Sequence, residues 1–213
     1  MIRLRSVGAV CIVALLASRP AVAQSPATAP PPPSSRVVDG LKFLAGGVIG
    51  LATHESGHLL VDLAFDAHPR FHRTHLGGVP FFAIVHRGEL SPRREFVIAA
   101  AGFWMQDATS EWMLARRPSL RSTHAPFTKG EFAFDEISSI GYGIVALANA
   151  GPSGNLVDTR GMANAAHVSE PFVGGLVLAP AVLDGYRYFH PDARWAKWAS
   201  RIAKAGTVVL LLK

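Results

Sequence analysis

The sequence is poor in cysteine and in charge. Its 213 residues include a single cysteine, Cys11, and only 17% of them are Asp, Glu, Lys or Arg. One cysteine forms no intramolecular disulfide and no cysteine-based zinc cluster, so any metal ion must be held by His, Asp or Glu. The sparse charge, 20 glycines and a mean hydropathy of +0.25 argue against an intrinsically disordered chain. Two classes remain, an unusually apolar soluble domain and a compact membrane protein.

The chain also lacks several simple patterns. It has neither a glycine triplet period nor sustained heptads, which excludes collagen-like and coiled-coil proteins. Lys and Arg outnumber Asp and Glu by 21 to 15, but the basic residues are dispersed and no recognition motif accompanies them. We therefore expect no nucleic-acid partner.

The first 23 residues predict a signal peptide. Arg3 and Arg5 precede a short apolar stretch from Val7 to Ala17, and the small residues Ala21 to Ala23 form a cleavage site. We therefore expect export from a bacterial cytoplasm. The alternative is an uncleaved first membrane helix, although the apolar run is shorter than the roughly 20 residues that a span needs.

Residues 24–35 are rich in proline and predict an extended linker, which leaves 36–213 as the folded domain. Within that domain, apolar segments of helix length alternate with polar or Gly/Pro-marked loops. The segment from Phe71 to Val85 instead favours a short strand or hairpin. The sequence predicts a mainly α, multi-helix membrane protein with four or five core helices and a short β-like loop after the first. The expected helices cover about 38–66, 93–115, 131–150, 171–189 and 192 to the end.

A His-Glu-x-x-His pattern occupies residues 54–58. On a helix, His54 and His58 lie on one face and can grip one zinc ion, while Glu55 lies beside them. Zinc lowers the pKa of a bound water toward about 7, and Glu55 would take the water's proton as the water attacks a peptide carbonyl. In the alternative interpretation, the two histidines satisfy each other or a structural carboxylate, or the chain is an inactive descendant of an enzyme.

The motif lies midway along an apolar helix. Ionisable groups within such a segment are expensive in a membrane and are candidate functional residues. Four glycines would weaken a solitary helix in water but let membrane helices approach closely. This composition favours a bilayer setting. The glycines are Gly46, Gly47, Gly50 and Gly57.

Catalytic zinc needs a third protein ligand. Asp184 is the first choice, because it is an acid within the apolar segment Leu178 to Tyr186, although it is also compatible with a helix-ending Asp-Gly turn. Glu111 is the alternative ligand. Asp62 lies four residues beyond His58 and would orient its imidazole, or it is an ordinary acid near a helix end.

The order of these motifs resembles the site-2 protease family of intramembrane zinc metalloproteases. His54, Glu55 and His58 match the family's first motif, and Leu183-Asp184-Gly185 matches the late motif. In the middle, residues Gly102 to Gln106 keep the glycine and an amide of the family's Gly-Pro-x-x-Asn but lack its proline.

The resemblance implies a membrane-embedded enzyme of the bacterial inner membrane that cleaves peptide bonds in or beside membrane segments of a protein or peptide substrate. His54, His58 and Asp184 would bind Zn²⁺, Glu55 would be the base, and Gln106 would hold the substrate strand. Two alternatives stay open, a catalytically inactive metal-binding membrane protein and a soluble zinc peptidase of the periplasm. The sequence predicts no oligomeric state.

Overall fold

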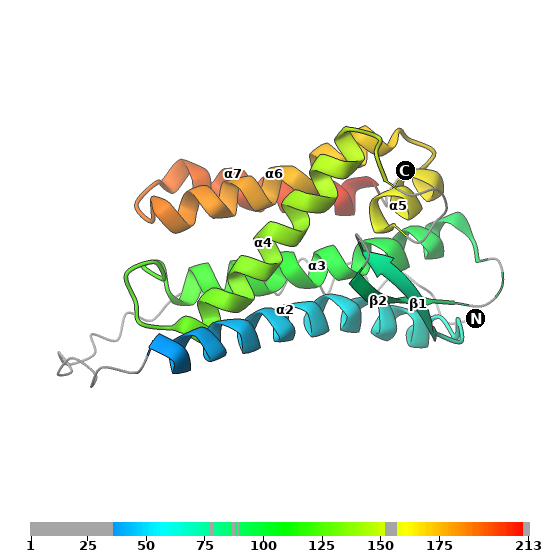
Figure 1. Ribbon diagram of the computed structural model, residues 1–213. Coiled ribbons are helices and arrows are strands. Elements are labelled where there is room, and N and C mark those ends of the chain that lie inside the picture. The colour runs from blue at the N-terminus through cyan, green and yellow to red at the C-terminus, as the bar shows by residue number, and fades with distance from the viewer. Residues whose placement is uncertain (1–35, 77–78, 87, 89, 152–156, 211–213) are drawn as a thin grey trace. The chain divides into compact units, whose positions relative to one another are not determined.

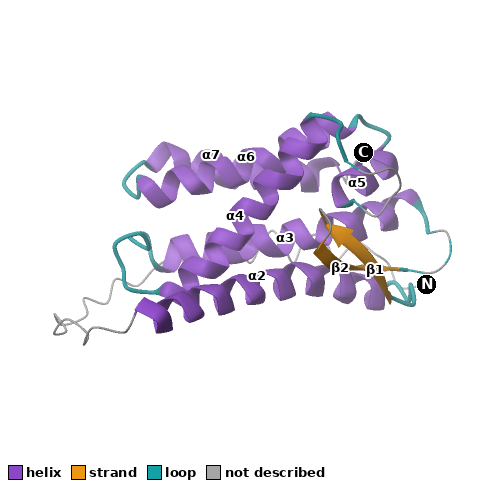
Figure 2. Ribbon diagram, in the orientation of Figure 1, coloured by secondary structure: helices purple, strands orange, loops and turns teal. Residues whose placement is uncertain are grey.

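The computed structural model describes residues 36–210 except 77–78, 87, 89 and 152–156. The expected signal peptide and linker lie outside the described residues. The described chain is mainly helical, with six helices and one two-stranded sheet (Figure 2). In chain order the elements are α2 (Arg36–Ala64), β1 (Arg70–Leu76), β2 (Val79–Val85), α3 (Pro92–Arg116), α4 (Pro126–Leu147), α5 (Asp158–Ala166), α6 (Glu170–Phe189) and α7 (Arg194–Leu210).

Proline marks the first turn of three helices. Pro92 follows Ser91, whose backbone is extended (φ −64°, ψ 148°), and Pro126 likewise opens α4. Proline suits this position because the first helical N–H groups have no partner within the helix. Pro171 stands in the first turn of α6, and the same helix continues through Pro180.

The expected hairpin is present. Strands β1 and β2 pair antiparallel, in a register that runs from Arg70 opposite Val85 to Leu76 opposite Val79. The five expected helices are also present, with α4 beginning at Pro126 rather than near 131. The short helix α5 was not expected. Its nine residues make little more than two turns, too few for a clear helical period.

Helix α4 crosses between two pairs of helices within residues 36–210 (Figure 1). It packs against α2 in the pair α2 and α3, and against α6 in the pair α6 and α7, while α5 packs on α3 and α6. Where α2 meets α4, Gly46 and Gly130 lack side chains that would collide with the backbone of Phe127 and Phe43. These two glycines therefore permit the close approach of the helices.

Besides an apolar core, the described residues include many buried polar side chains and many exposed apolar ones. Buried side chains include His54, Asp62, Glu111, Asp184 and Lys204, whereas large apolar side chains are exposed along most helices. Helix α2 is, among the described helices, the one long and apolar enough to cross a membrane. Only 17% of its most apolar 18-residue window is buried. Exposed apolar residues of α2 are Val37, Val38, Leu41, Phe43, Leu44, Val48, Ile49, Leu60 and Leu63.

Candidate metal centre

Helix α2 brings His54 and His58 together as the sequence predicts. The two residues lie one turn apart on the buried face of the helix, with exposed fractions of 4% and 5%. Their Nε2 atoms are 3.2 Å apart, and the ring planes are inclined by 68°. Both imidazoles thus direct the same nitrogen to one point.

Helix α3 fixes the orientation of both rings. His54 Nδ1 donates to Gln106 Oε1 at 3.0 Å, and His58 Nδ1 donates to the Ile98 carbonyl oxygen at 2.8 Å. When the imidazoles are neutral, as metal binding requires, each carries one proton, and these bonds leave the lone pair on Nε2. This is the arrangement in which histidines bind metals, with the outer nitrogen held by an oxygen acceptor.

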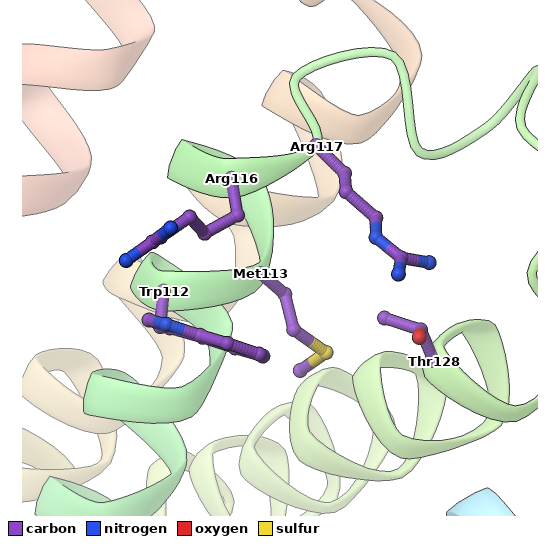
Figure 3. Close-up of a pocket in the computed structure, with 5 residues that line it drawn as sticks. All are labelled: Trp112, Met113, Arg116, Arg117 and Thr128. Carbon is purple, nitrogen blue, oxygen red and sulfur yellow. The ribbon is translucent and has the colours of Figure 1, made fainter. Parts of the chain in front are cut away.

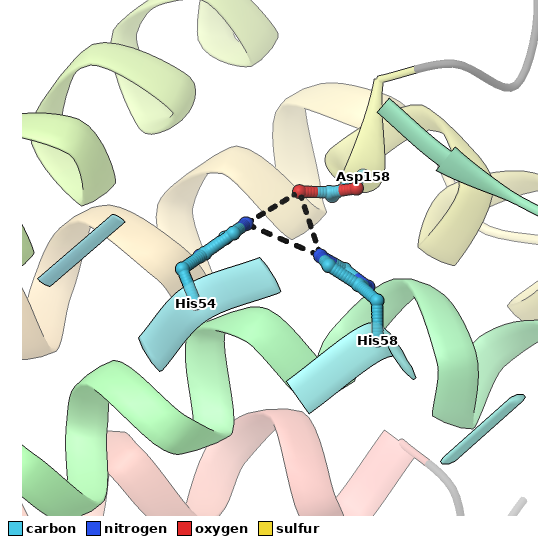
Figure 4. A group of neighbouring side chains, drawn as sticks. All are labelled: His54, His58 and Asp158. Carbon is cyan, nitrogen blue, oxygen red and sulfur yellow. Dashed lines mark hydrogen bonds and ion pairs between the residues drawn. The ribbon is translucent and has the colours of Figure 1, made fainter. Parts of the chain in front are cut away.

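Asp158, the first residue of α5, supplies the third ligand atom (Figure 4). Its Oδ2 lies 3.1 Å from His54 Nε2 and 3.5 Å from His58 Nε2. Of the described side chains, only these three form a group of three or more potential metal ligands within 4.8 Å of one another. The Asp158 side chain is 19% exposed, whereas the histidines are buried, so the cluster meets the protein surface at the carboxylate.

The position of α5 depends on an ion pair with α6. Arg160 lies 2.8 Å from Glu170 Oε2 and also donates to the Gly151 carbonyl. Burial by itself would raise the pKa of Asp158, but in the absence of a metal the positive charge of protonated His58 and His54, with their hydrogen bonds to the carboxylate, outweighs it and holds the pKa of that carboxyl below its usual value. Asp158 therefore stays ionised and able to bind a cation.

Gly102 of α3 makes room for the cluster. A Cβ atom on Gly102 would lie 2.5 Å from His54 Cε1 and 2.6 Å from the Nε2 atoms of both histidines. Only glycine leaves this space free. Gly102 and Gln106, the residues singled out in the middle motif, therefore both contact the histidine pair.

Other groups surround the three ligands. Glu55 is partly buried and close enough to His54, His58 and Asp158 for electrostatic interaction. The Tyr142 ring stacks on His54, with centroids 6.1 Å apart, and its hydroxyl interacts with Asp158. Phe103 packs edge-on against His54. The cluster is thus walled by two aromatic rings and flanked by one additional carboxylate.

The three converging atoms fit a metal ion. Two imidazole nitrogens and one carboxylate oxygen lie within 3.5 Å of one another, and either a proton on an imidazole or a metal ion between them offsets the repulsion of their lone pairs. Two histidines and one carboxylate are a donor set that catalytic zinc sites use. The residues present therefore suit zinc.

The structure does not bring Asp184 or Glu111 to the histidines. Asp184 lies 2.7 Å from Arg187 Nη1 and 2.5 Å from Lys204 Nζ, and it also accepts a hydrogen bond from Ser200. Glu111 lies 2.6 Å from both Arg187 and Arg201. We call these six residues of α3, α6 and α7 the ion cluster. Its three cations balance the charge of both carboxylates, and Asp158, rather than either of them, lies beside the histidines.

Two orienting roles also differ from expectation. Asp62 was expected to hold His58, but the Ile98 carbonyl does so, and neither Asp62 oxygen has a hydrogen-bond partner among the described residues. Gln106 was expected to hold the substrate strand. Its oxygen accepts from His54 and its amide nitrogen donates to Ser138 Oγ at 2.6 Å, so both ends of the amide are engaged within the protein.

Asp158 was missed because it follows a Gly- and Asn-containing loop and resembles an ordinary acid at a helix start. One signal was available, since Asp158 is the only acidic residue between Glu136 and Glu170. The role of the Ile98 carbonyl could not be predicted from the sequence, because every residue has a backbone oxygen. Comparisons with protein-family models, curated proteins and solved structures found no match to this chain.

A small surface pocket lies elsewhere, between the end of α3 and the start of α4 (Figure 3). None of its residues belongs to the metal cluster. Its lining residues are Trp112, Met113, Arg116, Arg117 and Thr128.

Proposed function

We propose that the protein is a zinc-dependent peptidase that hydrolyses peptide bonds in or near membrane segments of its substrates. One observation carries the proposal. His54 Nε2, His58 Nε2 and Asp158 Oδ2 converge within 3.5 Å while both Nδ1 atoms donate to oxygen acceptors. This geometry presents three lone pairs to one cation, and Glu55 stands beside them.

Each residue has a separate task in the proposed reaction. Zinc, when bound, supplies Lewis-acid activation of water and of the peptide carbonyl. His54, His58 and Asp158 hold it, and Gln106 and the Ile98 carbonyl keep the two imidazoles in the binding orientation. The Glu55 carboxylate accepts the proton of the attacking water and passes it to the leaving amine. Phe103 and Tyr142 shield His54 from bulk solvent.

The exposed apolar side chains of α2 support a membrane location. Helix α2 carries the histidine pair, and large apolar side chains are exposed near both of its ends, from Val37 to Ile49 and at Leu60 and Leu63. A core helix of a soluble protein is mostly buried, whereas only 17% of the apolar window of α2 is buried. Lipid is the solvent that such a face requires. We place the protein in the bacterial inner membrane, with lipid and a membrane-protein or peptide substrate as its partners.

Zinc content tests the proposed metal centre. We would measure zinc per chain by elemental mass spectrometry on detergent-extracted protein dialysed against zinc-free buffer, comparing wild type with Asp158→Asn, Asp184→Asn and Glu55→Gln. Wild type, Asp184→Asn and Glu55→Gln should each retain about one zinc, and Asp158→Asn should lose it. Zinc-free wild type, after purification with added zinc and no chelator, would exclude the metal centre.

Glu55→Gln then tests catalysis separately from metal binding. Membranes of cells that express wild type or Glu55→Gln would be compared by mass spectrometry of protein termini. New termini within membrane segments should accumulate with wild type alone. Identical termini in the two samples, with zinc still bound, would favour the catalytically inactive metal-binding protein.

A further inference from the structure

A second group of titratable side chains lies where α2 ends, β2 ends and α3 begins. Asp62 comes from the last turns of α2, His86 directly follows β2, and Glu95 lies in the first turn of α3. His86 Nδ1 is 3.7 Å from Asp62 Oδ1, and His86 Nε2 is 3.1 Å from Glu95 Oε1. The metal centre uses none of these three residues.

Glu95 fixes the orientation of His86. Its Oε1 accepts the Leu90 backbone N–H at 3.2 Å as well as the imidazole at 3.1 Å. A carboxylate oxygen only accepts, so His86 must donate from Nε2. The neutral ring then has its lone pair on Nδ1, the nitrogen that lies 3.7 Å from Asp62 Oδ1. This repeats the pattern at His54 and His58, where an oxygen acceptor holds the outer nitrogen.

Asp62 is a buried carboxylate that no described residue donates to. Its exposed fraction is 0%, and neither of its oxygens has a hydrogen-bond partner among the described residues. A proton on His86 Nδ1 would not supply one, because 3.7 Å exceeds the usual 2.7–3.2 Å of an N–H···O bond. A buried anion needs a cation or hydrogen bonds, so the gap between Asp62 and His86 calls for a ligand.

The size of the gap matches a metal ion. Zinc binds histidine nitrogen and carboxylate oxygen at about 2.0–2.2 Å, which puts two ligand atoms of a tetrahedral site about 3.4 Å apart. The observed 3.7 Å is within a few tenths of an ångström of that separation. We infer that Asp62 Oδ1 and His86 Nδ1 form a second divalent-metal site, with Glu95 orienting His86 and water completing the coordination.

This site is weaker than the centre at His54 because it has two protein ligands instead of three. Occupied, it ties the end of the hairpin to α2, one helical turn beyond His58. The start of α3 is held to the same point through Glu95. The inference goes beyond the proposed function and does not depend on it, since neither Glu55 nor Asp158 takes part.

The chain contains a matched control pair. His68 Nδ1 lies 3.9 Å from Asp66 Oδ1, a separation close to that of His86 and Asp62. Both control side chains are exposed, at 71% and 92%. Water satisfies them, so this pair has no need of a metal ion. His68→Ala therefore controls for zinc bound by surface histidines.

The test is a zinc titration of the full-length protein in detergent, with free zinc set by a metal buffer. Wild type should bind a second, weaker zinc ion. His86→Ala and Asp62→Asn should lose that ion, and Glu95→Gln should weaken it about 10-fold to 100-fold. His68→Ala should bind as wild type does. His54→Ala should lose the tighter ion and keep the weaker one, which separates failure of this site from failure of the metal centre.

Retention of the tighter zinc shows that each variant is folded. If His86→Ala or Asp62→Asn loses both zinc ions, that variant is not shown to be folded. The zinc affinity of Glu95→Gln then decides whether the second site exists, because Glu95 is not itself a zinc ligand in the proposed site. A wild-type protein that saturates with one zinc ion overturns the inference. So does a second zinc ion that His86→Ala, Asp62→Asn and Glu95→Gln leave unchanged.

Discussion

Asp158 Oδ2 lies 3.1 Å from His54 Nε2 although the two residues are 104 positions apart in the chain. His58 comes from the same helix as His54, so of the three residues only Asp158 is brought in from a distant part of the chain. The short helix α5 carries it, and the Arg160–Glu170 ion pair attaches that helix to α6. The geometry of the metal centre is therefore coupled to the packing of α5 on the bundle.

Gly102→Ala should impair the metal centre. The added Cβ would lie 2.5 Å from His54 Cε1, so one imidazole must move. Overpacking of this kind costs about 1–3 kcal/mol of unfolding free energy, and we expect weaker zinc binding as well. Isothermal titration with zinc and thermal unfolding in detergent would measure both.

Gly141→Ala is the matched control, because a Cβ at Gly141 meets nothing within 4 Å. It should leave zinc binding unchanged and add up to about 1 kcal/mol of helix stability. Equal zinc affinities for Gly102→Ala and Gly141→Ala would contradict the close contact of α3 with the histidines.

Gln106→Met should weaken zinc binding about 10-fold to 100-fold. The substitution removes the oxygen that accepts from His54 Nδ1, so the ring loses its fixed orientation. Gln106→Glu keeps an oxygen acceptor at the same length and should bind zinc more tightly than Gln106→Met. Competition with a fluorescent zinc chelator would rank the variants. If the two bind zinc equally, Gln106 does not orient His54.

Lys204→Met should destabilise the fold by about 3–5 kcal/mol and leave zinc bound. It removes the ammonium group 2.5 Å from the buried Asp184 carboxylate, so the negative charge of that carboxylate is less fully balanced. The double change of Lys204→Met with Asp184→Leu should recover part of the loss, because an apolar pair replaces the ions. Denaturant unfolding and zinc content would be measured together. Loss of zinc in folded Lys204→Met would show that the ion cluster supports the metal centre directly.

Helix α2 should be shielded by lipid. In a Cys11→Ser background, Val48→Cys places a thiol at a position that is 65% exposed in the protein. In intact membranes this thiol should resist a water-soluble maleimide, whereas Asp66→Cys, in the exposed turn after α2, should react. Equal labelling of Val48→Cys and Asp66→Cys would favour the soluble periplasmic peptidase.

Several features followed from the sequence because their causes are local. The separation of four residues puts His54 and His58 on one helix face whatever surrounds them. Apolar segments predicted the main helices, although α4 begins at Pro126 rather than near 131, and the run from Phe71 to Val85 predicted the hairpin. The glycine at 46 anticipated a close helix contact, which α4 makes.

Only the tertiary structure decided which acid completes the cluster. The sequence does not show whether Asp184 or Asp158 lies beside the histidines. That depends on which basic side chains fold against each carboxylate. Lys204 and Arg187 reach Asp184, while the two imidazoles reach Asp158. The acceptor for His58 is the Ile98 carbonyl, which any residue type would provide. Local spacing thus determined the histidine pair, and packing of distant helices determined its partners.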